Sequence, residues 1–243
     1  MPYNEAQRGG SAMQNLVVTR FEHKYLLTDA QAAELRGKLN AALAADSHNA
    51  GPSGSYLVRS LYFDTPDSRD YLDKVDGLFS RQKLRLRVYG GEGGRAKLEC
   101  KQKQGDYQKK TSVWVTADQC DAFARGDFSS LLDTDDEDAH FLYALASRGY
   151  RPAGLVEYRR SAWLLGVRNT RVTLDFDVRG TDVLPTLYGP VVLRPLLDPG
   201  LVVLEVKFDR KLAPFVRRLL KGYQRTRLSC GKYENCRALN ELL

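Results

Sequence analysis

The chain has 243 residues, of which 43% are hydrophobic and 10% aromatic, enough for a folded core and too much for a disordered protein. Its net charge of +7 favours an anionic partner: a nucleic acid, an anionic lipid or a phosphorylated small molecule. No apolar run is long enough for a transmembrane helix, and the first fifteen residues lack the apolar segment of a secretory signal. We therefore expect a cytoplasmic protein whose four cysteines are reduced.

Period-two alternation and turn residues divide the chain into strands and helices that follow a flexible tail at residues 1–15. Two capping boxes, Thr28 with Gln31 and Thr116 with Gln119, mark the starts of two helices. Further helices are expected within 66–77, over 139–147 and from Pro214, a residue that suits a first helical turn. The expected strands are 17–27, 56–63, 81–88, 97–103, 107–115, 154–165, 171–178 and 201–208, with a short extra strand at 191–193. Without an internal repeat or a low-complexity linker, residues 16–243 are expected to form a single domain.

The hairpin predicted over residues 81–103 has one apolar and one cationic face, because successive residues of a strand point to opposite sides. Its charged positions are Arg81, Lys83, Arg85, Arg87, Lys97, Glu99, Lys101 and Lys103. Like charges side by side on paired strands repel each other. Water or a polyanion must therefore neutralise this face.

The other strands repeat the pattern, with basic residues and a few carboxylates on one face and apolar residues on the other. The charged candidates are Arg20, Glu22, Lys24, Lys109, Arg159 or Arg160, Arg171, Asp175, Glu205 and Lys207. One interpretation is a sandwich whose charged faces meet solvent. The other follows from the apolar stripes of the helices, which must cover the apolar strand faces and thereby turn the charges inward. We favour the second: an α+β protein, mainly antiparallel β, whose eight strands close a tunnel barrel with helices packed on the outside.

A cationic tunnel with a few carboxylates predicts phosphate chemistry. Arginine and lysine bind phosphate oxygens, and carboxylates are the oxygen ligands that divalent cations prefer. Together they are the usual electrostatic equipment of phosphoryl transfer, although the chain has neither a P-loop nor kinase motifs. A tunnel cannot admit a nucleic-acid duplex, so no nucleic-acid partner is expected. The residues alone thus indicate metal-assisted chemistry on, or binding of, a linear phosphate.

Eight short motifs, in order, resemble the VTC-type polyphosphate polymerase domain of the triphosphate tunnel metalloenzymes. They are R-F-E-H-K-Y (20–25), S-L-Y-F-D-T (60–65), K-L-R-L-R-V-Y (83–89), L-E-C-K (98–101), Y-R-R-S-A-W (158–163), R-V-T-L-D (171–175), L-E-V-K-F (204–208) and S-C-G-K-Y (229–233). The resemblance implies an eight-stranded tunnel in which the γ-phosphate of ATP is transferred to a growing polyphosphate chain with Mn²⁺ or Mg²⁺. ATP and polyphosphate are the implied partners.

The resemblance also assigns roles to residues of this chain. Triphosphate ligands would be Lys24, Arg85, Arg87, Lys101, Lys109, Arg160 and Arg171, with Lys232 closing the phosphate site. Arg85, Arg87, Arg160 and Arg171 would act on the transferring group, and Glu205 would hold the metal. The charge pattern adds further substrate-binding candidates, Arg20, Lys83, Lys103 and Lys207, and secondary metal candidates, Glu22, Glu99 and Asp175.

One departure concerns the first motif, where hydrolytic members of the superfamily resemble E-x-E-x-K and this chain has Arg20 in the first position. The change removes a carboxylate and adds a cation, which favours polymer binding over activation of water. An inorganic triphosphatase acting on tripolyphosphate and a non-catalytic polyanion-binding module stay open as alternatives. Export of polymer across a membrane would require a separate membrane partner.

Overall fold

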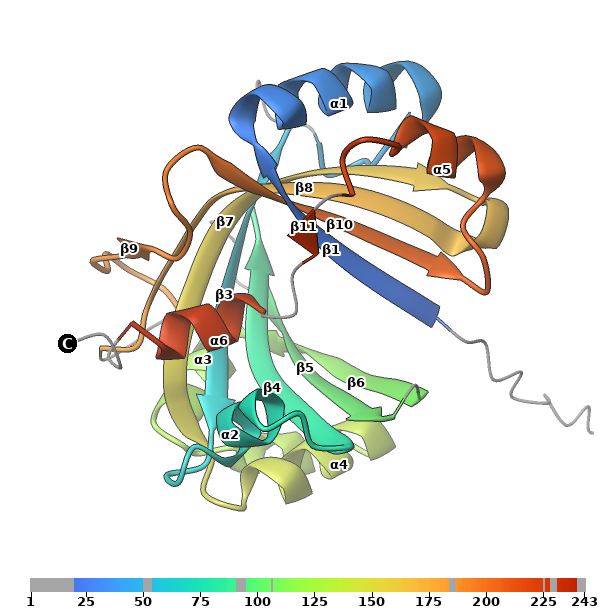
Figure 1. Ribbon diagram of the computed structural model, residues 1–243. Coiled ribbons are helices and arrows are strands. Elements are labelled where there is room, and N and C mark those ends of the chain that lie inside the picture. The colour runs from blue at the N-terminus through green and yellow to red at the C-terminus, as the bar shows by residue number, and fades with distance from the viewer. Residues whose placement is uncertain are drawn as a thin grey trace, which may run out of the picture.

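The computed structural model describes residues 20–49, 54–90, 95–105, 107–183, 187–224, 226–227 and 231–239. Their main feature is one antiparallel sheet in the order β11-β1-β10-β8-β7-β3-β4-β5-β6, with β2 and β9 attached at its side (Figure 1). Eight strands are long: β1 (Arg20–Thr28), β3 (Tyr56–Asp64), β4 (Ser80–Tyr89), β5 (Arg95–Gln104), β6 (Tyr107–Thr116), β7 (Arg151–Leu165), β8 (Thr170–Thr181) and β10 (Leu201–Asp209). Three have two residues each: β2 (Ala44–Ala45), β9 (Arg194–Pro195) and β11 (Thr226–Arg227).

The six α-helices of the described residues are α1 (Asp29–Ala42), α2 (Arg69–Val75), α3 (Ala117–Ala124), α4 (Glu137–Ala146), α5 (Pro214–Leu219) and α6 (Lys232–Arg237). Both predicted capping boxes are confirmed, because the Thr28 and Thr116 hydroxyls each accept a hydrogen bond from the backbone three residues on. The predicted start of α5 at Pro214 is confirmed as well. The strand expected at 191–193 is wrong: the extended pair lies at Arg194–Pro195. None of the described helices is long and apolar enough to cross a membrane.

Strand alternation gives the curved sheet an apolar convex face, which four helices cover (Figure 1). Leu35 and Leu39 of α1 are fully buried against β8, β10 and α5. Phe123 of α3 and Leu142 of α4 are equally buried against β4, β5 and β6. These contacts confirm that the apolar stripes turn the charged strand faces inward.

The prediction of a closed barrel is not confirmed. The strand order ends at β6 on one side and at β11, next to β1, on the other, and no backbone pairing joins these ends among the described residues. Side chains span the opening instead: Lys101 Nζ of β5 donates to Glu22 Oε2 of β1 at 3.0 Å. The sheet is therefore a strongly curved, open structure with a concave charged face.

The expectation that all helices lie outside is wrong for α6, which was not predicted. It packs against the concave face, where the Tyr233 ring stacks on Tyr62 with centroids 4.8 Å apart. The Tyr233 hydroxyl donates to Asp64 Oδ2 at 2.7 Å, and Arg237 donates to Ser68 Oγ at 2.9 Å. Six residues with no apolar stripe of their own gave no helical pattern, and the helix depends on these tertiary contacts.

Candidate functional site

The concave face collects the charged residues of seven long strands, because directly opposed residues of antiparallel strands share a face. Arg85 lies opposite Glu99, Lys24 opposite Glu205, and Lys207 opposite Arg171. The helix α6 adds Lys232, whose Nζ lies 2.6 Å from Asp175 Oδ2. The cations of this face are Lys24, Arg81, Lys83, Arg85, Arg87, Arg95, Lys97, Lys101, Lys103, Lys110, Arg160, Arg171, Lys207 and Lys232.

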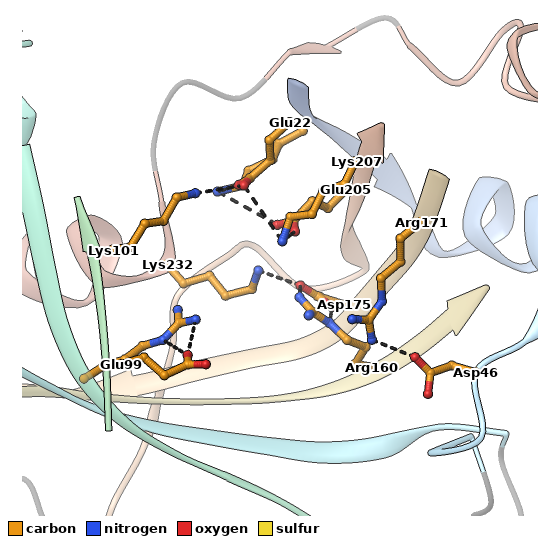
Figure 2. Close-up of polar contacts among 12 residues, drawn as sticks. Glu22, Asp46, Glu99, Lys101, Arg160, Arg171, Asp175, Glu205, Lys207 and Lys232 are labelled. Atoms are coloured by element: carbon orange, nitrogen blue, oxygen red, sulfur yellow. Dashed lines mark hydrogen bonds and ion pairs between the residues drawn. The ribbon is translucent and has the colours of Figure 1, made fainter. Parts of the chain in front are cut away.

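Glu22 and Glu205 form one cluster with three lysines (Figure 2). Glu22 is 3.1 Å from Lys24 and 3.0 Å from Lys101, and Glu205 is 2.6 Å from Lys207. Burial and the nearby Glu205 raise the pKa of Glu22, but the lysines lower it more, to about 2. Burial raises the pKa of Glu205 too, yet Lys207 and Lys24 hold it well below its ordinary value. Both carboxylates are therefore ionised at neutral pH.

Arg160 forms a two-pronged ion pair with Asp175 in the centre of the face (Figure 2). Its Nε and Nη2 donate to the two carboxylate oxygens at 2.7 and 2.8 Å, and both side chains are buried. Burial raises the pKa of Asp175, and the charges of Arg160 and Lys232 more than reverse the shift. The neighbouring Arg159 lies exposed on the other face, so the choice of Arg160 from the motif is consistent with the structure.

Glu99 pairs with Arg85, whose Nε and Nη2 donate at 2.9 and 2.8 Å, and with Lys110 of β6. Lys110 lies opposite Lys101 and belongs to the concave face, whereas Lys109 lies on the convex face, with its Nζ 5.4 Å from the Phe141 ring centroid. The prediction that Lys109 faces the other cations is therefore wrong, and Lys110 occupies that place. Val113 and Val115 of β6 are buried on the convex face, and alternation along the strand places Lys109 on that face and Lys110 with the charges.

The sequence matches the VTC domain family over residues 19–240. The chain belongs to the VTC domain family. Among solved structures, a candidate adenylate cyclase from Bacillus halodurans has a TM-score of 0.50 and 13% identity, covering 86% of this chain and 93% of that one. The PH1819 protein of Pyrococcus horikoshii has a TM-score of 0.49 and 12% identity, covering 92% and 99%. No curated protein matches the sequence. The family associates the chain with polyphosphate, and the cyclase likeness shows the fold.

Two cations of the VTC domain are held by groups that the sequence did not single out. Arg171 Nη2 donates to Asp46 Oδ2 at 2.8 Å and to the Tyr56 hydroxyl at 3.0 Å. Lys83 pairs with Glu234 of α6. Asp46 and Glu234 lie far from their partners in sequence and outside any period-two pattern, so only the folded chain brings them together.

Three further predicted residues, Arg87, Lys103 and Arg20, differ in how the structure places them. Arg87 is buried on the concave face, and its Nε donates to Ser60 Oγ at 2.9 Å. Lys103 lies on the same face opposite Arg81, towards one end of the hairpin. Arg20 begins β1 opposite Asp209, but its side chain lies outside the described residues.

A divalent cation is the group that the VTC family implies for this face. Glu22 and Glu205 fit it best, since both are ionised, close together and hard oxygen donors. Glu99 and Asp175 are each bound to an arginine through two hydrogen bonds, which leaves them less free. No group of three or more potential ligands occurs among the described residues. A Mg²⁺-like ion bound by one or two carboxylates needs phosphate oxygens and water to complete its shell.

Proposed function

We propose that this protein is a polyphosphate polymerase, which transfers the γ-phosphate of ATP to the end of a polyphosphate chain bound on the concave face. Membership of the VTC domain family supports this proposal at the level of polyphosphate chemistry. The observation that carries it is the convergence of buried or half-buried cations from β1, β4, β5, β7, β8, β10 and α6 on one face. A row of this kind matches a linear polyanion better than a single phosphate.

The proposed reaction needs no protein nucleophile. A terminal phosphate oxygen of the chain attacks the γ-phosphorus, the bond from that phosphorus to the β-bridging oxygen breaks, and ADP leaves. Arg85, Arg87, Arg160 and Arg171 would neutralise the charge on the transferring group. Arg160 can do so without losing Asp175, because three of its five N–H donors are not used in that pair. A bound divalent ion, held by Glu205 and Glu22, would supply Lewis-acid neutralisation of the phosphates.

The test is incubation of the purified protein with ATP and Mn²⁺ or Mg²⁺, followed by gel analysis of the products. We expect long polyphosphate chains, with one ADP released for each phosphate added to a chain. Orthophosphate alone, with release of phosphate from tripolyphosphate, would overturn the proposal in favour of a triphosphatase. Binding of tripolyphosphate without turnover in either metal would overturn it in favour of a binding module.

Two neighbouring lysines of β6 provide a matched pair for this test. Lys110→Ala removes a cation from the concave face, and we expect its Kd for tripolyphosphate to rise about tenfold, the scale of one charge-assisted hydrogen bond. Lys109→Ala removes the same charge from the convex face and should leave the Kd within about twofold of the parent. Equal effects of the two substitutions, measured by calorimetric titration, would show that net charge and not the concave face determines binding.

A further inference from the structure

Trp114 is a large aromatic residue that stays exposed on the concave face. It lies on β6, the last strand of the sheet, directly opposite Lys97 of β5. Its side chain is 54% exposed, whereas the other tryptophan of the chain, Trp163, is 1% exposed. The concave face is otherwise polar near this point, so packing of the core does not account for an indole there.

The contacts of the Trp114 ring are cationic. Lys97 Nζ lies 5.2 Å and the Arg95 guanidinium carbon 5.7 Å from the ring centroid. No other aromatic ring of the described residues stacks on it, in contrast to Tyr56, Tyr89 and His48, which pack on one another with centroids 5.5 to 6.2 Å apart. Because Trp114 is half exposed although these two cations lie over its ring, part of the indole surface is open to a planar ligand beside positive charge.

The position of Trp114 relative to the phosphate-binding cations is fixed by the strand register. Ser60, Arg87, Lys97 and Trp114 follow one another across β3, β4, β5 and β6 at a single level of the sheet. Neighbouring strands are about 4.8 Å apart, so the backbone of Trp114 lies roughly 10 Å from the backbone of Arg87, with Lys97 between them. A ligand with phosphates at Arg87 and a planar group beyond them would place that group at Trp114.

We propose that Trp114 is the stacking platform for the nucleobase of the nucleoside triphosphate substrate. This inference rests on the proposed function and adds a base subsite to it. Arg95 and Lys97 would hold the indole in place and face the sugar and the phosphates nearest to it. Stacking tolerates every base, since each has a π-face, so the site would accept nucleoside triphosphates in general and distinguish them from tripolyphosphate, which has no base.

The experiment uses the full chain and two ligands that differ in the base: a β,γ-imido ATP analogue and tripolyphosphate. Because Trp163 is buried, quenching of the exposed tryptophan fluorescence reports on Trp114. We expect the ATP analogue to quench this fluorescence and tripolyphosphate at equal occupancy to leave it unchanged. Calorimetric titration of Trp114→Ala should show a Kd for the ATP analogue about tenfold higher, with the Kd for tripolyphosphate within about twofold of the parent. Trp114→Phe, which keeps an aromatic face, should fall between them.

Tyr107→Ala is the matched control, because Tyr107 is also 54% exposed and lies on β6, but on the convex face opposite Gln104. It should bind both ligands like the parent. An equal loss of both ligands in Trp114→Ala would overturn the inference, since it would mean that the indole only orders Arg95 and Lys97. Polymer synthesis by the parent is measured in parallel. If the parent synthesises polyphosphate but Trp114→Ala binds the ATP analogue normally, only the base subsite is overturned. If quenching depends on the base but the parent synthesises no polyphosphate, only the proposed polymerase activity is overturned.

Discussion

The carboxylates of the concave face each neutralise more than one cation. Glu22 lies within 4.0 Å of Lys24, Lys101 and Lys207, and Asp175 lies between Arg160 and Lys232. Such buried pairs add little net stability, but removing one partner leaves an uncompensated charge and is costly. In the free protein the carboxylates therefore keep the like charges together, and a bound polyphosphate would take over part of that role.

The ion pairs of Glu22 make the stability of the folded chain depend on pH. Its ordinary pKa is 4.5, and the folded state lowers it to about 2, so the unfolded chain binds more protons between these values. The stability that Glu22 contributes is complete above pH 4.5 and is lost as the pH falls towards 2. We expect Glu22→Gln to lower the free energy of unfolding, measured with urea, by its full amount at pH 6, and by progressively less down to pH 3.

The matched control is Glu137→Gln, which lies exposed in the first turn of α4, away from the concave face. Its difference from the parent should stay small across the same pH range. A difference between Glu22→Gln and the parent that stays constant from pH 6 to pH 3 would contradict the assignment of the ionised carboxylate to Glu22.

At the scale of elements, α6 presents opposite charges to the concave face from two positions. Lys232 contacts Asp175, and Glu234 contacts Lys83 and is almost fully buried, with its Oε2 lacking a hydrogen-bond partner among the described residues. Burial raises the pKa of Glu234, but the charges of Lys83 and Lys24 lower it by more. Its pKa is therefore below the ordinary value, and the carboxylate is ionised at neutral pH. An anion at this end of the face would therefore be attracted by Lys232 and repelled by Glu234.

Substitutions at these two positions should change affinity in opposite directions. Glu234→Gln removes a buried negative charge and releases Lys83, so we expect tighter binding of tripolyphosphate. Lys232→Met removes a cation, and we expect the Kd of this variant for tripolyphosphate to rise about tenfold, the scale of one charge-assisted hydrogen bond. Calorimetric titration of both variants checks the signs. Weaker binding in both would mean that α6 contributes only through its fold.

The same elements show which parts of the fold and of the candidate site the sequence alone predicts. Alternation within a strand is a local property, so the charged faces of β1, β4, β5, β8 and β10 could be assigned from it, and the capping boxes are local too. The faces of β6 follow from its buried Val113 and Val115, and of its two adjacent lysines the sequence-based expectation chose Lys109, which shares the face of these valines. The helix α6 and the Arg171–Asp46 pair depend on contacts between distant segments, which no periodicity encodes.

At the scale of the whole molecule, the curved sheet is held at its open side by side chains. The Lys101–Glu22 pair links β5 to β1, whereas the described backbone makes no hydrogen bond between β6 and β1 or β11. A polyanion that contacts cations of β1, β4, β5, β8 and β10 together would bridge both sides of the opening. Ligand binding should therefore stabilise the entire fold and not one strand pair.

We expect this stabilisation to appear as a higher Tm. A ligand at one hundred times its Kd adds about 2.7 kcal/mol to the free energy of unfolding, which is roughly 5 to 11 °C for a chain of this size. Differential scanning calorimetry with tripolyphosphate measures the shift. Sodium sulfate at equal ionic strength controls for screening of exposed charges, which acts without bridging the opening and should raise the Tm much less. An equal shift with sulfate would assign the effect to general charge screening, and the open side would then need no bound chain to hold it together.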